Sequence, residues 1–211
     1  MNKEYMWYCS YGSNLSEDRF LCYIKGGKPK GSDRTEVGCR DKSLPLKNKP
    51  IKMDNELLFV ESSVRWSNMG VAIVNPNTKN NLKSYGRMYL ITKEQFIDIV
   101  KQENGISLEK AQQIDFTKNN KGNNSVLLEG KRYGLILCIG EDEGYPIYTF
   151  TTSKNVDKIE INAPSKEYLQ MIASGLVETY GLNNNELANY FLQFKGVKNN
   201  YNYKQLIEFF K

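Results

Sequence analysis

The chain has 211 residues, with 29 Lys plus Arg, 24 Asp plus Glu and no histidine, which gives a formal net charge of +5. The lack of histidine excludes a Ser-His-Asp or Cys-His nucleophile and a His-ligated zinc site, so an enzyme built on this chain must use Asp, Glu, Lys, Tyr or Cys as its acid or base. A hydrophobic content of 40% and a mean hydropathy of −0.57 suit one globular domain or two small ones and exclude a membrane span.

The N-terminal sequence MNKEY lacks the apolar segment of a signal peptide, and we expect a cytoplasmic protein. The four cysteines show neither C-x-x-C spacing nor a dense disulfide framework, which predicts reduced thiols.

The first half of the chain reads as short strands with two helices between them. Residues 5–10 are rich in aromatic side chains and predict a buried strand. A helix is expected over residues 15–24, with Asn14 as its N-cap and Gly26-Gly27 as its stop. Strands follow at 56–61, 70–75 and 85–91, and Thr92 with Gln95 forms a capping-box pattern for a helix that ends near Gly105.

The second half begins with strands and ends with helices. A short helix is expected over 107–114, strands over 126–129, 133–139 and 145–152, and helices over 165–180, 186–195 and 203–210. No repeat and no linker divides the chain. The pattern predicts one α+β domain over residues 1–211, with a core at about 5–180 and a helical extension at about 181–211.

The positive charge is concentrated in residues 25–52, which hold nine basic and three acidic residues and therefore net +6 against −1 for the rest of the chain. This segment is rich in Gly and Pro, which favours a solvated loop. The alternative is an anion or nucleic-acid surface. Tyr23 is the only aromatic residue beside it, so the stacking side chains of a single-strand binder are lacking, and a nucleic-acid partner is disfavoured.

The first candidate site is the junction Tyr11-Gly12-Ser13-Asn14-Leu15 between a strand and a helix. Such a turn leaves backbone amides unpaired, and these amides can bind a carboxylate or phosphate with help from the helix dipole. The spacing matches neither common phosphate-binding motif, and on spacing alone an ordinary capped turn is the favoured interpretation.

The second candidate is Glu103, which shares one helical face with Phe96, Ile99 and Val100. A carboxylate on an apolar stripe near a helix C-terminus has its neutral form favoured, so its pKa rises toward the range of a general acid–base. A frayed helix end with Glu103 in water is an equally good interpretation of the residues alone.

Residues 8–15 (YCSYGSNL) resemble the motif that opens γ-glutamylcyclotransferase-like proteins. Further similar segments follow in the family's order: residues 66–72 (WSNMGVA), 86–89 (GRMY), Gln102-Glu103 before Gly105, a strand carrying Tyr148, and residues 164–168 (PSKEY). The resemblance covers about residues 5–180 and implies a small mixed β-barrel flanked by helices, here with extra C-terminal helices.

The resemblance also implies the activity: cyclisation of an N-terminal γ-glutamyl group to 5-oxoproline with release of an amine, without cofactor or metal. Glu103 would be the catalytic residue. The substrate-binding residues would be Tyr11, Gly12, Ser13, Asn14, Leu15, Tyr148 and Tyr168. The implied partner is a small γ-glutamyl substrate, not a membrane, and the protein would act as a monomer or homodimer.

Two features depart from the family pattern. The tyrosine that follows the catalytic Glu-Gly in relatives of the mammalian enzyme is replaced by Ile106-Ser107-Leu108, and residues 25–52 and the tail exceed the family core. The leaving amine is therefore open. The alternative functions are a non-catalytic γ-glutamyl or carboxylate-binding module on the same fold, and a nucleic-acid-associated protein that uses residues 25–52. Arg19, early in the first helix, is expected to be solvated or structural.

Overall fold

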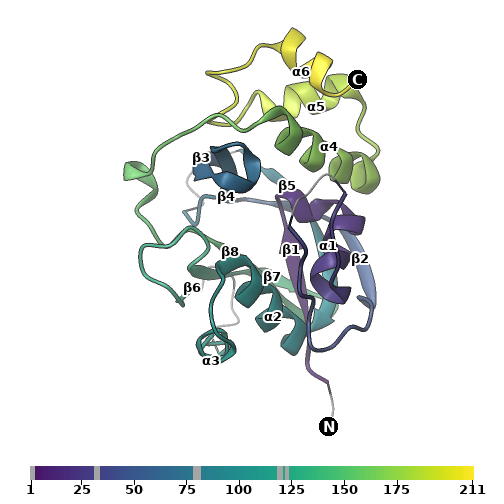
Figure 1. Ribbon diagram of the computed structural model, residues 1–211, viewed down its shortest axis with the longest axis vertical. Coiled ribbons are helices and arrows are strands. Elements are labelled where there is room, and N and C mark those ends of the chain that lie inside the picture. Colours follow the sequence, from purple (N-terminus) through teal and green to yellow (C-terminus); the bar gives the residue numbers. More distant parts are fainter. Residues whose placement is uncertain (1–2, 31–33, 78–81, 118–120, 122–123) are drawn as a thin grey trace.

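A six-stranded mixed sheet in the order β2-β5-β1-β8-β7-β6 forms the centre of the computed structural model, which describes residues 3–30, 34–77, 82–117, 121 and 124–211 (Figure 1). Strand β1 runs antiparallel to β5 and parallel to β8, and every other pair in the sheet is antiparallel. The strands of this sheet are β1 (Tyr5–Ser10), β2 (Lys47–Met53), β5 (Ser84–Thr92), β6 (Asn124–Val126), β7 (Leu135–Asp142) and β8 (Tyr145–Thr151).

A separate hairpin consists of β3 (Leu57–Ser63) and β4 (Met69–Val74), joined through the 3-10 turn η2 (Val64–Trp66). Backbone bridges from Leu58 to Lys195 and from Val60 to Ile161 attach the hairpin to the C-terminal part of the chain. The α+β class is therefore confirmed. Within the described residues the strands make an open sheet and a hairpin, and no ladder closes them into a barrel.

Side chains alternate across β1 and bury both faces of the sheet, because successive residues of a strand point to opposite sides. Trp7 and Cys9 belong to one cluster of buried residues, with helices of the C-terminal third. Met6 and Tyr8 belong to the other, with residues of the two N-terminal helices. Strand β1 is therefore rich in aromatic residues and has no polar face.

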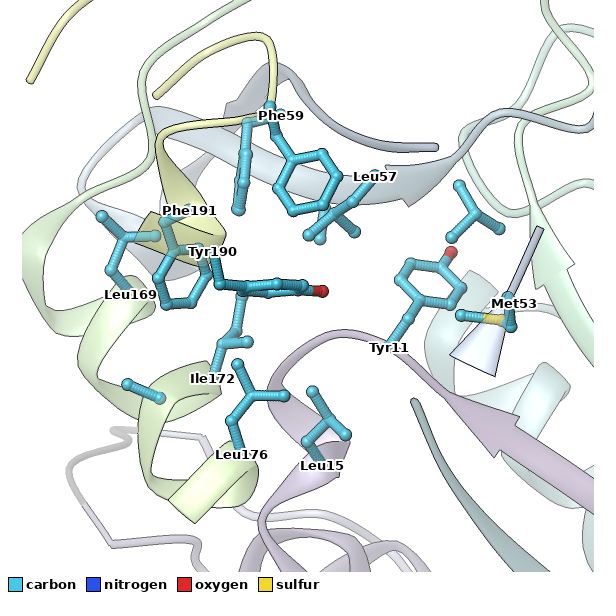
Figure 2. Packing of buried hydrophobic residues seen from close by; sticks show 14 of the residues in the cluster. Tyr11, Leu15, Met53, Leu57, Phe59, Leu169, Ile172, Leu176, Tyr190 and Phe191 are labelled. Atoms are coloured by element: carbon cyan, nitrogen blue, oxygen red, sulfur yellow. The ribbon is translucent and has the colours of Figure 1, made fainter. Parts of the chain in front are cut away.

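Helices cover the two faces separately. The first cluster packs on α4 (Lys166–Tyr180), α5 (Asn184–Phe191) and α6 (Tyr203–Phe209), which lie at the top of Figure 1, and the second on α1 (Glu17–Lys25) and α2 (Lys93–Asn104). The small helix α3 (Leu108–Ala111) follows α2, and the 3-10 turns η1 (Ser13–Leu15) and η3 (Val156–Lys158) complete the elements. Figure 2 shows Leu15 of η1 beside Ile172 and Leu176 of α4.

Local sequence signals explain the helix ends. Thr92 and Gln95 form the expected capping box at the start of α2, and Gly105 ends that helix in the left-handed conformation with φ 60°. Ser165 caps α4 and Gly181 ends it with φ 67°. Among the described residues no helix is long and apolar enough to cross a membrane.

The solvated-loop prediction is wrong for the end of the basic segment, where β2 pairs with β5 along its whole length. Its lysines lie on exposed or half-buried positions of an edge strand, and Pro50 is tolerated there because an edge strand need not donate from both sides. Propensity gave no indication of this strand, since Lys, Asn and Pro are all rare in strands.

Other boundaries also differ from expectation, and the helix expected over 107–114 spans only Leu108–Ala111. The strand expected over 126–129 lies at Asn124–Val126, and the helix expected over 186–195 ends at Phe191. Asn14 is not an N-cap: η1 precedes α1, and Ser16 holds the cap position without a side-chain hydrogen bond. The side chain of Asn14 instead contacts Glu103.

Candidate active site

A pocket of about 320 Å³ lies where β1 ends, between η1, η2, the last turn of α2 and the start of α4. The structure brings six of the expected site residues into its wall: Tyr11, Gly12, Ser13, Asn14, Glu103 and Tyr168. These residues come from three parts of the sequence separated by up to about 150 positions, so the pocket exists only in the folded chain.

The junction after β1 contributes Gly12, Ser13 and Asn14 to the pocket wall. The two hydrogen bonds that close η1 use the amides of Leu15 and Ser16, which leaves those of Ser13 and Asn14 outside the turn's own hydrogen bonds. The Tyr89 hydroxyl donates to the carbonyls of Asn14 and Leu15 at 3.1 and 3.3 Å. Two carbonyls of the turn are therefore held from β5.

Glu103 meets this junction directly. The Asn14 side-chain amide donates to Glu103 Oε1 at 3.1 Å, across 89 positions of sequence. Helix α2 continues to Asn104, so Glu103 lies in its last turn below the fully buried Phe96, Ile99 and Val100. The structure therefore does not agree with the alternative in which the helix is frayed at Glu103.

Removal from water raises the pKa of Glu103 above its ordinary value. The nearby guanidinium of Arg65, hydrogen bonding with the Tyr23 hydroxyl and the charge of Arg19 oppose this rise, because they stabilise the carboxylate. Burial and these three neighbours thus act on the pKa of Glu103 in opposite directions, and burial has the larger effect.

An ion pair between the half-buried Arg65 and the buried Glu36 supports the tyrosine beside Glu103. Arg65 donates from Nη2 to Glu36 Oε1 at 2.9 Å and from Nη1 to the Tyr23 hydroxyl at 3.0 Å. Glu36 is only 3% exposed, so this pair has little competition from water. Sequence reasoning missed these three residues, because their partners lie on separate segments and only the fold joins them.

Tyr168 closes one side of the junction. Its hydroxyl accepts from the Ala72 amide at 3.1 Å and lies 3.2 Å from where a Cβ on Gly12 would be, so only glycine fits there without displacing it. Burial raises the pKa of Tyr168 to about 12, so its hydroxyl remains protonated at neutral pH. Trp66 packs on its ring with the centroids 4.6 Å apart.

Two expected site residues are not in the pocket wall. Leu15 is fully buried in the core under α4, because the turn of η1 directs its side chain to the apolar cluster. Tyr148 packs against Phe96 and Phe116, and its hydroxyl donates to the Phe116 carbonyl at 3.3 Å. We correct both to core residues.

Of the two alternatives expected for Arg19, the structure agrees with a structural role and not with a solvated one. It is 2% exposed, and its Nε and Nη2 groups are buried without a hydrogen-bond partner. Its guanidinium lies over the ring of Trp66, 5.3 Å from the centroid. Neither the residue type of Arg19 nor its position in the helix predicts that it is buried.

No family model matches the sequence. A curated relative, histone deacetylase 5 of Arabidopsis thaliana, is 36% identical over a 197-residue match that covers 88% of this chain and 30% of that protein. The chain thus spans less than a third of the length of this relative, whose name describes the longer protein as a whole.

Two solved structures share the fold. A γ-glutamyl cyclotransferase superposes with a TM-score of 0.50 at 17% identity, covering 89% of this chain and 86% of that one. An uncharacterized human protein superposes with a TM-score of 0.53 at 16% identity, covering 98% and 99%. The chain therefore has the γ-glutamyl cyclotransferase-like fold that the motif resemblance implied.

Proposed function

We propose that the protein is a γ-glutamylcyclotransferase-type enzyme that converts an N-terminal γ-glutamyl group to 5-oxoproline and releases the attached amine. The observation that carries this proposal is the contact between the Glu103 carboxylate and Asn14 of the junction after β1, inside a pocket large enough for a dipeptide-sized ligand. The fold shared with a γ-glutamyl cyclotransferase supports it.

The reaction needs one proton acceptor and no covalent nucleophile. Glu103, ionised, takes a proton from the substrate α-ammonium, and the freed amine attacks the γ-carbonyl carbon to form the C–N bond of the ring. Glu103 gives that proton to the nitrogen of the departing amine as the C–N bond to it breaks. The carboxylate then takes the second proton from the ring nitrogen and passes it to the released amine, which leaves as an ammonium. The substrate atoms are all found in 5-oxoproline and the free amine, so no water is consumed.

The pocket contributes mainly by holding the substrate in reactive geometry, because both reacting groups lie in one molecule. The buried Asn14 Oδ1 has no hydrogen-bond partner and is available to accept from the α-ammonium beside Glu103. The amides of Gly12, Ser13 and Asn14 would hold the α-carboxylate or the oxyanion that develops on the γ-carbonyl. Tyr11 and Tyr168 would shape the wall.

The direct test is a substrate panel. Purified protein is incubated with γ-glutamyl dipeptides and γ-glutamylamines, and 5-oxoproline and the released amine are followed by mass spectrometry. We expect equimolar release of both products from at least one substrate. Thermal stabilisation by these compounds without product from any of them would instead identify a γ-glutamyl-binding module.

The pH profile provides a second test. Arg65 lowers the pKa of Glu103, so Arg65→Gln should raise that pKa further and move the acid limb of kcat/KM to higher pH. Lys25→Gln, which removes a positive charge from the exposed end of α1, is the matched control and should leave the limb in place. An acid limb that is unchanged or lower in Arg65→Gln would contradict Glu103 as the proton acceptor.

A further inference from the structure

Glu36 belongs to the basic segment 25–52, yet it is buried, and the backbone on both sides of it is attached to the helices of the site. Glu36 and Gly27, which lies just after the end of α1, exchange two backbone hydrogen bonds of 2.8 and 3.0 Å. Two residues after Glu36, the Gly38 amide donates to the side chain of Gln102 in α2 at 3.0 Å. The fold therefore delivers a single carboxylate of this segment to a fixed place beside the pocket.

The Glu36 carboxylate determines where the charge of Arg65 lies. Arg65 donates to Glu36 at 2.9 Å and to the Tyr23 hydroxyl at 3.0 Å, and Tyr23 in turn hydrogen bonds with Glu103. Among the described residues of the pocket wall, Glu103 is the only carboxylate, and Arg65 is ion-paired with Glu36 instead of with it. Because an unpaired buried charge is costly, a guanidinium without Glu36 would turn to the carboxylate that remains.

Charged and titratable groups face Glu103 from several elements. Arg65 and Arg19 are the cations and Glu36 is the anion among them, while the Tyr23 hydroxyl hydrogen bonds with the carboxylate. Burial raises the pKa of the four other tyrosines that face Glu103, so their hydroxyls stay protonated at neutral pH: Tyr8, Tyr11, Tyr133 and Tyr168. The exposed Arg34 also lies 4.0 Å from Glu36, measured from Nε to Oε2. Within this set, Glu36 is the group that offsets the charge of Arg65.

We propose that Glu36 is a positioning residue for the reaction: it holds the Arg65 guanidinium at the Tyr23 hydroxyl and away from an ion pair with Glu103, which leaves the Glu103 carboxylate free to accept the substrate proton. The inference rests on the proposed cyclotransferase function. A carboxylate that is paired directly with an arginine is a weaker base, because the pair favours its ionised form. The basic segment thus takes part in the site through one acidic residue and not through its lysines.

Removing the charge at either end of the pair should move the acid limb of kcat/KM in opposite directions. Glu36→Gln keeps an oxygen that accepts from Arg65 but loses the negative charge, so the pKa of Glu103 should fall and the limb should move to lower pH by about one unit. Arg65→Gln should move the limb to higher pH. The double variant, which lacks both charges, should lie between the two single variants. Glu94→Gln removes the exposed partner of Arg40 in α2 and, as the matched control, should leave the limb in place.

A merely structural ion pair would lower stability or activity in both single variants without moving the limb in opposite directions. That result would overturn the inference and leave the cyclotransferase proposal intact. If Glu36→Gln alone does not fold, Arg65→Gln is compared with the double variant, in which neither charge of the pair is left alone. The limb of the double variant should then lie at the lower pH. Equal limbs, or a double variant that does not fold, would overturn the inference.

A direct titration separates the two proposals if no substrate is turned over. The pKa of Glu103 is then measured by NMR on the glutamate side-chain carboxyl carbons, with Glu103→Gln identifying the signal. A pKa that falls in Glu36→Gln and rises in Arg65→Gln would sustain the effect of Glu36 on this carboxylate while the cyclotransferase reaction is rejected. An unchanged pKa in Glu36→Gln would reject the inference as well.

Discussion

Replacing Glu103 with glutamine should lower kcat for 5-oxoproline release by about 10³-fold, the usual contribution of a positioned general acid–base. Glutamine keeps the size of the side chain and can still accept from the Asn14 amide, so the 3.1 Å contact at the junction is preserved while the proton acceptor is removed. KM should change little, because Glu103 acts on the proton and the other pocket residues hold the substrate. The measurement is steady-state kinetics on the best substrate of the panel.

Stability against pH provides the folding control for this variant. The fold raises the pKa of Glu103, so it favours the protonated form, and the stability linked to that form is present below the unfolded-state value of about 4.3 and is lost as the pH rises through the raised pKa. Glutamine resembles the protonated carboxyl. The melting temperature of Glu103→Gln should therefore equal that of the wild type at about pH 4 and exceed it at neutral pH.

A folded Glu103→Gln variant with wild-type turnover would refute the mechanism. Equal melting temperatures at both pH values would instead show that the carboxylate is not desolvated in the folded protein. Turnover therefore tests the role of Glu103 in proton transfer, and the melting temperatures test its removal from water.

Local patterns identified candidates but did not decide their roles. Three apolar residues at helical spacing and a glycine stop placed Glu103 at a defined point of α2, and a polar, glycine-containing turn drew attention to Tyr11, Gly12, Ser13 and Asn14. The resemblance to γ-glutamylcyclotransferase-like proteins then favoured a site over a frayed helix end and an ordinary capped turn.

The rest of the site depends on contacts between distant segments. The residue type of Asn14 predicted a helix cap, but its side chain donates a hydrogen bond to Glu103, 89 positions away. Nothing near Arg19 in the sequence shows that Trp66 covers it, and nothing near Glu36 shows that Arg65 neutralises it. A sequence-based prediction places polar side chains on the surface, because most of them are exposed in folded proteins. Only the fold shows which of them are buried.

Gly175 is another residue whose role only packing explains. It lies inside α4, where glycine is unfavourable by about 1 kcal/mol relative to alanine. A Cβ at this position would lie 2.4 Å from the carbonyl carbon of Leu15 and from the backbone nitrogen of Ser16. These are backbone atoms of the junction, so they cannot move aside as the end of a flexible side chain would. Helix propensity and packing therefore make opposite predictions for Gly175→Ala.

We expect Gly175→Ala to destabilise the protein, because the added Cβ clashes with backbone atoms. Overpacking of this kind lowers the free energy of unfolding by about 3 kcal/mol, which is more than the gain in helix propensity. Urea unfolding of Gly175→Ala should show this loss at an unchanged m-value. Ser174→Ala, exposed on the neighbouring position of the same helix, is the matched control and should stay within about 0.5 kcal/mol of the wild type. Because η1 carries Ser13 and Asn14, a displaced junction should also lower kcat/KM in the fraction that remains folded. A Gly175→Ala variant as stable as Ser174→Ala would show that α4 does not fix the position of η1.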